Sequence, residues 1–413
     1  MMLRHIVLPL CLFVGTSLAH AAPGKIGPFD LKSSDGDWRL TVGLAIQLRY
    51  QLDAVGLDQD DGSLDGFVEA RRIRPTLRGT LGTKKLSYYL HLSTAPGSLE
   101  FMDFYLDYAF SPRLQTRVGQ WKIPFTRFRT ASFKDLTLVD WPITTLYFGA
   151  ERQMGLALHN GYEKTPAGLQ YEAGIFGGDN ARASHAVGLP RLFGEKLENP
   201  SSLASPGPRA TLHPELVAHL AYNLNRIDTD TDTDWEGGEL RLSAGLSAAW
   251  DLDPDRHVDL ALRLAPELLL KVRHLSFFSV FYLGFVRQGD GVADQRLGML
   301  GVTFQTSYLF IQRLELALRY SMVHVDSRVA EDARSRAAPI IAAAADSDEA
   351  ATLTRQYGKA GQVNREHEAS LDLNVYFIGR SLKLQTDLSW LNHDLLARQQ
   401  SDLRLRIQLQ LAF

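Results

Sequence analysis

The sequence predicts an all-β protein, a transmembrane antiparallel β-barrel of about 16 strands with long extracellular loops. Three observations indicate this fold class. Apolar and polar residues alternate with a period of two over segments longer than most soluble strands. No apolar run after residue 22 is long enough to span a membrane as a helix. Long and short connections alternate along the chain.

The last predicted strand shows the alternation most clearly. Leu403, Leu405 and Ile407 alternate with Arg404 and Arg406. An arginine facing lipid near the bilayer midplane costs about 2–4 kcal/mol, so the arginines should face a wet interior. A soluble sandwich would show the same alternation with its faces reversed. Strand length favours the barrel, because a tilted membrane-spanning strand needs about 9–11 residues and most segments are that long.

Sixteen segments fit this pattern, and an even number is typical of bacterial single-chain barrels. The predicted strands are 38–51, 67–81, 85–94, 100–110, 113–122, 152–160, 167–176, 216–225, 239–251, 256–268, 273–287, 297–309, 312–326, 366–378, 380–392 and 402–413. The boundary near Lys271 to His274 is the weakest of the set, and boundaries predicted from sequence generally carry an error of about 2–4 residues.

The connections test the barrel independently of the strands. If the first strand begins on the periplasmic side, loops after odd-numbered strands face outward and should be long. All four long gaps follow odd-numbered strands: 52–66, 123–151, 177–215 and 327–365. The exceptions are two short outward loops, 95–99 and 252–255, and a longish inward turn, 226–238.

The first 22 residues have the layout of a secretory signal peptide. Arg4 precedes an apolar stretch, and Ala19-His20-Ala21 forms a small-x-small cleavage site. We therefore expect a cleaved signal over residues 1–22, a short periplasmic leader over 23–37 and a barrel domain over 38–413, located in the bacterial outer membrane. The single cysteine, Cys11, lies in the signal, which argues against a disulfide scaffold or a cysteine-based zinc site.

Composition narrows the function classes. The 413 residues include 44 Lys and Arg against 47 Asp and Glu, so the chain lacks the basic excess of a nucleic-acid binder. No glycine-rich phosphate loop lies between a strand and a helix, and the histidines show no triad or metal-ligand spacing. We therefore expect no enzyme, no cofactor, no metal and no nucleic-acid partner.

Several stretches between residues 67 and 160 point to one family. They are Glu69-Ala70-Arg71-Arg72-Ile73-Arg74 with Leu77-Arg78-Gly79-Thr80-Leu81, Phe104-Tyr105-Leu106-Asp107-Tyr108, Arg117-Val118-Gly119-Gln120-Trp121-Lys122-Ile123-Pro124-Phe125, and Arg152-Gln153-Met154-Gly155-Leu156. In these stretches the chain resembles the phosphate-selective porin O/P family of outer-membrane porins. The remainder is similar only in its barrel pattern.

The resemblance implies a sixteen-stranded homotrimeric porin whose third outward loop folds into the lumen as a constriction. It also implies that the terminal Phe413 resembles the signal read by the outer-membrane assembly machinery. The partners expected from it are outer-membrane lipid, two further copies of the chain and small hydrophilic anions.

The same region suggests where an ion pathway would lie. Arg72, Arg74 and Arg78 share one face of the strand 67–81. The loop that follows strand 113–122 begins with further cations before the first acid, Asp135. If the loop folds inward, seven cations share a narrow region: Arg72, Arg74, Arg78, Lys122, Arg127, Arg129 and Lys134. Such a ring would favour anions, because guanidinium groups match phosphate or carboxylate oxygens.

A second interpretation stays open, because basic residues in a porin lumen are often paired with acids. Glu100, Asp103 and Asp107 lie on the polar face of a nearby predicted strand. The lumen could therefore prefer anions or be mixed and weakly selective. The net charge of −3 means that any anion preference would come from the placement of a few cations.

Two other segments have open interpretations. The run Asp228 to Asp234, followed by Glu236, is either a solvated turn that resists aggregation or a calcium site. The loop 327–365 contains an alanine-rich stretch that we expect to form a short helix on the outer rim, and its role is open.

These observations predict a passive porin in which small hydrophilic solutes, with some preference for anions such as phosphate, diffuse past loop 123–151 and the arginine row of strand 67–81. The alternative is an outer-membrane binding or adhesion barrel with functional extracellular loops and a closed lumen. An enzyme on a barrel scaffold would need a triad at the rim, which the sequence does not specify.

Overall fold

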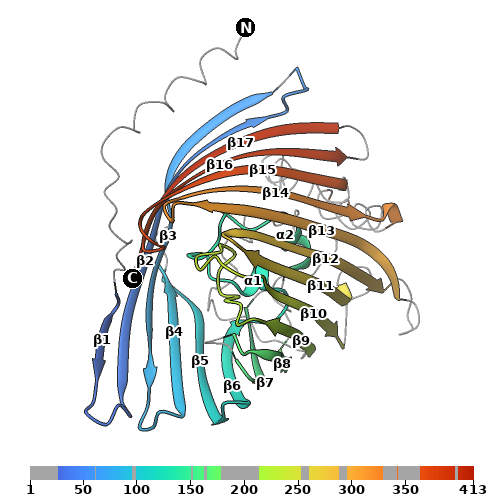
Figure 1. Ribbon diagram of the computed structural model, residues 1–413. Helices are drawn as coiled ribbons and strands as arrows, with labels where there is room; N and C mark the ends of the chain where they lie inside the picture. Colours follow the sequence, from blue (N-terminus) through green and yellow to red (C-terminus); the bar gives the residue numbers. More distant parts are fainter. Residues whose placement is uncertain are drawn as a thin grey trace.

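The computed structural model describes residues 27–60, 62–94, 99–149, 152–161, 165–177, 214–252, 260–287, 295–328, 342, 363–395 and 399–413. These residues form one large antiparallel sheet that closes on itself, because the last strand pairs with the second (Figure 1). No helix in this part of the chain is long and apolar enough to cross a membrane.

Sixteen strands make up the closed barrel. They are β2 (Arg39–Val55), β3 (Ser63–Thr80), β4 (Leu86–Ser93), β5 (Glu100–Ser111), β6 (Leu114–Lys122), β7 (Arg152–His159), β8 (Gly168–Phe176), β9 (Glu215–Leu224), β10 (Arg241–Asp251), β11 (Leu260–Val272), β12 (Leu275–Arg287), β13 (Gln295–Phe310), β14 (Leu314–Val325), β15 (Val363–Ile378), β16 (Leu382–Leu395) and β17 (Gln399–Ala412). The predicted antiparallel barrel is confirmed, and each predicted strand overlaps one observed strand.

The differences from the predicted strands are local. The largest displacement is in β11, which begins and ends four residues later than the predicted segment 256–268. Its run Leu268-Leu269-Leu270 is apolar on both faces, so alternation gives no boundary there. The predicted long loop 52–66 is shorter than expected, because β2 continues to Val55 and β3 begins at Ser63.

A short strand precedes the barrel in the expected leader. Strand β1 (Phe29–Lys32) pairs with residues 39–42 of β2, next to the position where β17 ends. The signal peptide expected over residues 1–22 lies outside the described residues. So do most of the loops 177–215 and 327–365, including the alanine-rich stretch except Ala342.

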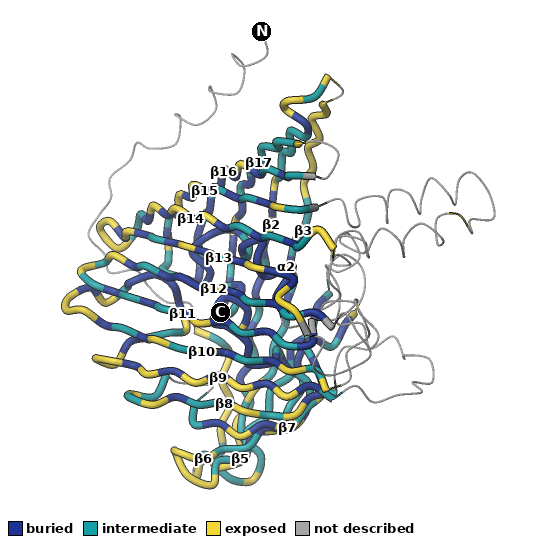
Figure 2. The backbone as a smooth tube through the Cα atoms, turned by 90° about the vertical axis from the view of Figure 1, so that its right-hand side faces the viewer, coloured by how far each residue is buried: buried dark blue, intermediate teal, exposed yellow. Residues whose placement is uncertain are grey.

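Burial alternates along the strands as expected of a membrane barrel, with polar residues buried on the inside and apolar residues exposed on the outside. In β9, Glu215, His219 and Asn223 are buried on the inside, whereas Leu220 and Tyr222 are exposed on the outside. Figure 2 shows the same alternation of buried and exposed positions on neighbouring strands. The outer surface is therefore apolar and the inner surface polar, as a wet lumen within lipid requires.

The segment between β6 and β7 folds into the barrel as the predicted constriction loop, which we define as residues 123–149. It contains two short helices, α1 (Arg127–Thr130) and α2 (Thr144–Phe148) (Figure 1). Phe128 stacks on Phe278 with ring centroids 4.0 Å apart, and Phe148 stacks on Tyr282 at 5.0 Å. The inner face of β12 is apolar at these positions, so the loop packs there as it would in a protein core.

A charged anchor holds the middle of the constriction loop. Asp140 lies 3.1 Å from Arg49 Nη1 and 3.0 Å from Arg72 Nη2, on strands β2 and β3. Burial alone would raise the pKa of Asp140, but the positive charges of Arg72, Arg49 and Arg71 lower that pKa well below its usual range. Asp140 is therefore ionised and ties the loop to the barrel wall opposite β12.

The acidic turn between β9 and β10 also folds into the barrel, and we call residues 225–240 the inner turn. Thr231, Asp232 and Asp234 are buried, so the interpretation as a solvated turn is wrong for these residues, whereas Asp230 and Glu236 are exposed. The physical reason is a partner distant in sequence. Lys271 of β11 donates hydrogen bonds from Nζ to the carbonyl oxygens of Asp228 and Thr231, at 2.7 and 2.6 Å. Among the described residues, no group of three acids, histidines or cysteines is placed to hold a metal ion.

Replacing Asp140 with Asn should loosen the constriction loop and leave the barrel closed. The change leaves Arg49 and Arg72 buried without their shared counter-charge. This should lower the free energy needed to release the loop from the barrel wall by about 3 kcal/mol. Hydrogen exchange of the protein in detergent should then speed up roughly 100-fold at amides of the loop, and remain unchanged in β9 to β11. The exposed Asp60→Asn in the β2–β3 loop is the charge-matched control. Equal protection of the loop in D140N and D60N would contradict the anchor.

Candidate functional site

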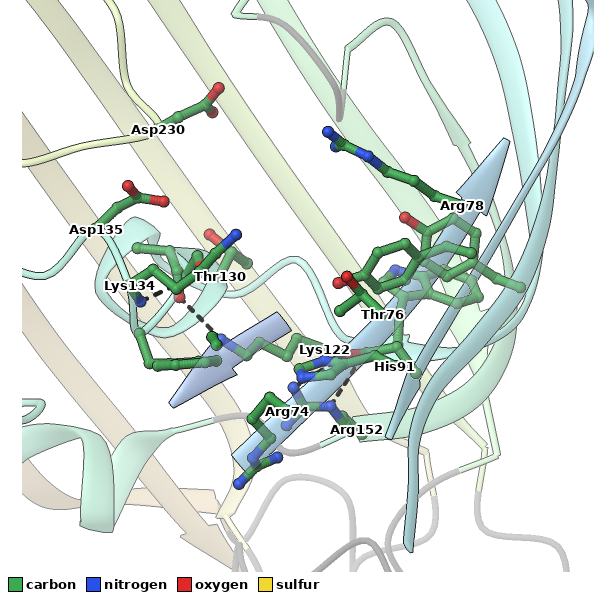
Figure 3. A pocket seen from close by; sticks show the side chains of 18 of the residues that line it. Arg74, Thr76, Arg78, His91, Lys122, Thr130, Lys134, Asp135, Arg152 and Asp230 are labelled. Carbon is green, nitrogen blue, oxygen red and sulfur yellow. Dashed lines mark hydrogen bonds and ion pairs between the residues drawn. The ribbon is translucent and has the colours of Figure 1, made fainter. Parts of the chain in front are cut away.

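A cavity of about 380 Å³ lies between the constriction loop, the wall formed by β3 to β8, and the inner turn (Figure 3). Seven cationic side chains line it: Arg74, Arg78, Arg117, Lys122, Arg127, Lys134 and Arg152. Four acidic side chains line it as well: Asp103, Asp135, Glu172 and Asp230. The loop packs against β12 on the far side, so this cavity lies on the side of the loop that faces β3 to β8.

The structure brings five of the seven predicted site residues to the cavity: Arg74, Arg78, Lys122, Arg127 and Lys134. The other two, Arg72 and Arg129, are buried and are not among its lining residues. Arg72 binds Asp140 and donates a hydrogen bond to Gln47 at 2.8 Å. The guanidinium of Arg129 lies 5.1 Å from the ring centroid of Trp141, within the loop.

The arginine row of β3 follows from the period of a strand. Arg74, Thr76 and Arg78 are two residues apart, so all three point to the inside, where Arg78 is paired in register with Tyr89 of β4. The guanidinium of Arg74 lies 6.0 Å from the ring of Phe133 on the constriction loop. The loop therefore meets the row at Arg74 and leaves Arg78 more open, as its exposed side chain shows.

Two lining arginines were missed by sequence reasoning, Arg117 on β6 and Arg152 at the start of β7. Both have acids as partners: Arg117 Nη2 lies 2.9 Å from Asp107, and Arg152 Nε lies 2.8 Å from Asp103. Arg117 has the same strand parity as the buried Trp121, which was a usable signal for an inward position. Arg152 pairs in register with Lys122, and this follows only from the β6–β7 pairing.

Ion pairs neutralise much of the positive charge around the cavity. In addition to the pairs of Arg117 and Arg152, Arg127 Nε lies 3.1 Å from Glu267 of β11. Lys122 donates a hydrogen bond to the carbonyl oxygen of Ala131 at 2.8 Å. Within the described residues, Arg74 and Arg78 form no ion pair, so they are the arginines of the cavity whose charge is not directly cancelled.

The opposite side of the cavity is acidic. Figure 3 shows Asp135 of the constriction loop and Asp230 of the inner turn across the cavity from Arg78. Asp135 pairs with Arg380 at 3.0 Å. In the described part of the chain Asp230 has no ion-pair partner, and its side chain is exposed to the cavity. The cavity thus has a basic wall on β3, β6 and β7. The loop contributes both signs, with Arg127 and Lys134 next to Asp135, and the inner turn contributes the carboxylate of Asp230.

Comparisons with known proteins agree with this geometry. Residues 42–192 match the family model described as phosphate-selective porin O and P. No curated protein sequence matches the chain. Among solved structures, the chain is similar to the outer membrane channel DcaP of Acinetobacter baumannii, with 14% identity, a TM-score of 0.55, and 94% of this chain and 100% of that chain covered.

Two other barrels are similar to the same degree. Pseudomonas putida OprB has 12% identity and a TM-score of 0.56, over 92% of this chain and 95% of that one. The anion-selective porin from Comamonas acidovorans has 11% identity and a TM-score of 0.51, over 91% of this chain and 99% of that chain. These likenesses show the fold, which is that of outer-membrane channels. The closed sixteen-stranded barrel is thus shared with these structures, and residues 42–192 of the chain are similar to the phosphate-selective porin O and P family.

Proposed function

We propose that this outer-membrane barrel is a passive, water-filled channel for small hydrophilic solutes, with a preference for small anions such as phosphate. The observation that carries the proposal is the cavity beside the constriction loop, where Arg74 and Arg78 have no acidic partner among the described residues. Uncancelled guanidinium groups in a narrow passage lower the barrier for anions and raise it for cations.

The preference should be moderate, because most neighbouring charges are paired. Arg117, Arg127 and Arg152 each have a carboxylate within 3.1 Å. A paired arginine contributes little field at a distance, so the selectivity would depend on a few side chains.

We further propose that the channel is a homotrimer exported with a cleaved signal peptide, and that Phe413 is read by the assembly machinery. Phe413 donates a backbone hydrogen bond to Leu44 at 3.0 Å and accepts one at 3.1 Å, which places the last residue in the barrel seam.

The direct test is reconstitution of the purified protein in a planar bilayer with a potassium chloride gradient. A porin gives ohmic current steps, and the reversal potential should have the sign for chloride passing more readily than potassium. A folded barrel that gives no steps would contradict the channel and favour the adhesion barrel. A reversal potential of the opposite sign would contradict the anion preference alone.

Neutralising the unpaired arginines should reduce that preference. The double variant R74Q/R78Q should lower the chloride to potassium permeability ratio about threefold or more, because it removes two uncancelled charges from the passage. R226Q, an exposed arginine of the inner turn outside the cavity lining, is the control and should behave as wild type. An unchanged ratio in R74Q/R78Q would remove the arginine row from the ion pathway.

Selectivity should also depend on pH through the carboxylate of Asp230. Burial of the inner turn within the barrel, and then the negative charges of Asp228 and Asp135, raise the pKa of Asp230 to about 6. Asp230 is therefore charged above that pH and neutral below it. Lowering the pH from about 7.5 to about 5 should raise the chloride preference about twofold, since one negative charge leaves the cavity. In D230N this increase should disappear. If D230N shows the same increase as wild type, the pH dependence comes from other titratable groups.

A further inference from the structure

The inner turn gives the cavity a second, oppositely charged wall. Thr229 and Asp230 of this turn line the cavity together with Asp135 of the constriction loop. The basic wall comes from other elements, with Arg74 and Arg78 on β3. Figure 3 shows Asp230 across the cavity from Arg78, whereas Asp135 lies beside Lys134 of the same loop and pairs with Arg380. A solute between Asp230 and Arg78 therefore meets a negative charge on one side and a positive charge on the other.

The inner turn holds Asp230 in a fixed position. Lys271 Nζ binds the carbonyl oxygens of Asp228 and Thr231, which bracket Asp230 in the chain. The backbone N–H of Asp230 donates to the Asp228 carboxylate at 2.9 Å. Thr229 is held from the other side, because its N–H donates to Thr165 Oγ1 at 3.2 Å. A carboxylate on so constrained a backbone can act as a preorganised contact for a solute.

The charges of the two walls are held apart. Arg74, Arg78 and Asp230 all line the cavity, and none of them forms an ion pair with a described residue. Opposite charges that the fold keeps from meeting can be joined by a solute that carries both signs. A simple anion gains only from the basic wall and is repelled by Asp230, and a simple cation has the reverse problem.

We infer that the cavity favours small dipolar solutes that carry one anionic and one cationic group, and that Asp230 is the residue that determines this specificity. The anionic group lies against Arg78, which faces Asp230 across the cavity, and the ammonium group lies against Asp230. This inference rests on the proposed channel function. It leaves the preference for anions over cations in place and adds that a dipolar solute enters faster than an anion of the same size.

Uptake of taurine and isethionate into proteoliposomes tests the inference. The two solutes share the ethanesulfonate skeleton and differ in having an ammonium or a hydroxyl group at the other end. Wild-type protein should admit taurine faster than isethionate. In D230N the ratio of taurine to isethionate uptake should fall about threefold, the size expected for one solvated charge pair. D230E should keep most of the wild-type ratio.

Glu239→Gln provides the matched control, because Glu239 is an exposed acid of the same turn that does not line the cavity. The heat-dependent mobility of each variant on a gel verifies that its barrel is folded, and Asp230→Ser replaces D230N if that variant fails to fold. Faster entry of isethionate than taurine in wild type would overturn the inference without any variant. The inference would also be overturned if the neutral Asp230 variant showed the same ratio of taurine to isethionate uptake as E239Q.

The channel function and the dipolar specificity can be contradicted separately. If a folded wild-type barrel admits neither solute, the channel function is contradicted and the inference falls with it. If both solutes enter but the ratio is insensitive to Asp230, the channel stands and only the dipolar specificity is wrong.

Discussion

The pairing of β17 with β2 is the constraint on which the rest of the structure depends. Ten register pairs, from Leu403↔Ala54 to Ala412↔Ala45, join the last strand to the first barrel strand. Closure gives every strand of the barrel a neighbouring strand on both sides, as a sheet that spans lipid requires. It also separates the two faces of every strand, so that Arg406 binds Asp387 inside while Leu409 is exposed outside.

Closure alone would leave a wide lumen, and two segments narrow it. The constriction loop packs its aromatic residues on the apolar inner face of β12, where Phe128 stacks on Phe278. Its middle is tied through Asp140 to Arg49 and Arg72 on the other side. One attachment is apolar and the other is ionic, so the loop is held at both walls. The cavity lies between the loop and strands β3 to β8.

The inner turn couples to the loop from the other end of the barrel. Thr233 lies within hydrogen-bond distance of Thr137 on the constriction loop, at 3.3 Å, and donates to Glu315 of β14 at 3.2 Å. The turn thus supports the loop and brings Asp230 to the cavity. Selectivity in such a passage depends less on how many charges are present than on which ones have no partner.

Alternation made the barrel predictable, because the inward or outward direction of a strand residue is a local property. Arg74 and Arg78 could be placed inside for that reason. The partner of Arg72 could not be found from the sequence, since Asp140 lies on a loop whose path depends on the packing of Phe128 and Phe148. The burial of the inner turn escaped prediction for a similar reason: it depends on Lys271 of β11, and a run of aspartates is ordinarily solvated.

The central claim is that solutes pass along β3 to β8 and not between the constriction loop and β13. Single cysteines at Arg78 and Thr303 test it most directly, because Thr303 is fully buried where its hydroxyl bonds Thr144 of the loop at 2.7 Å. A charged thiol reagent added during a bilayer recording should reduce the current through R78C and leave T303C unchanged. Rapid block of T303C with no effect on R78C would contradict the account.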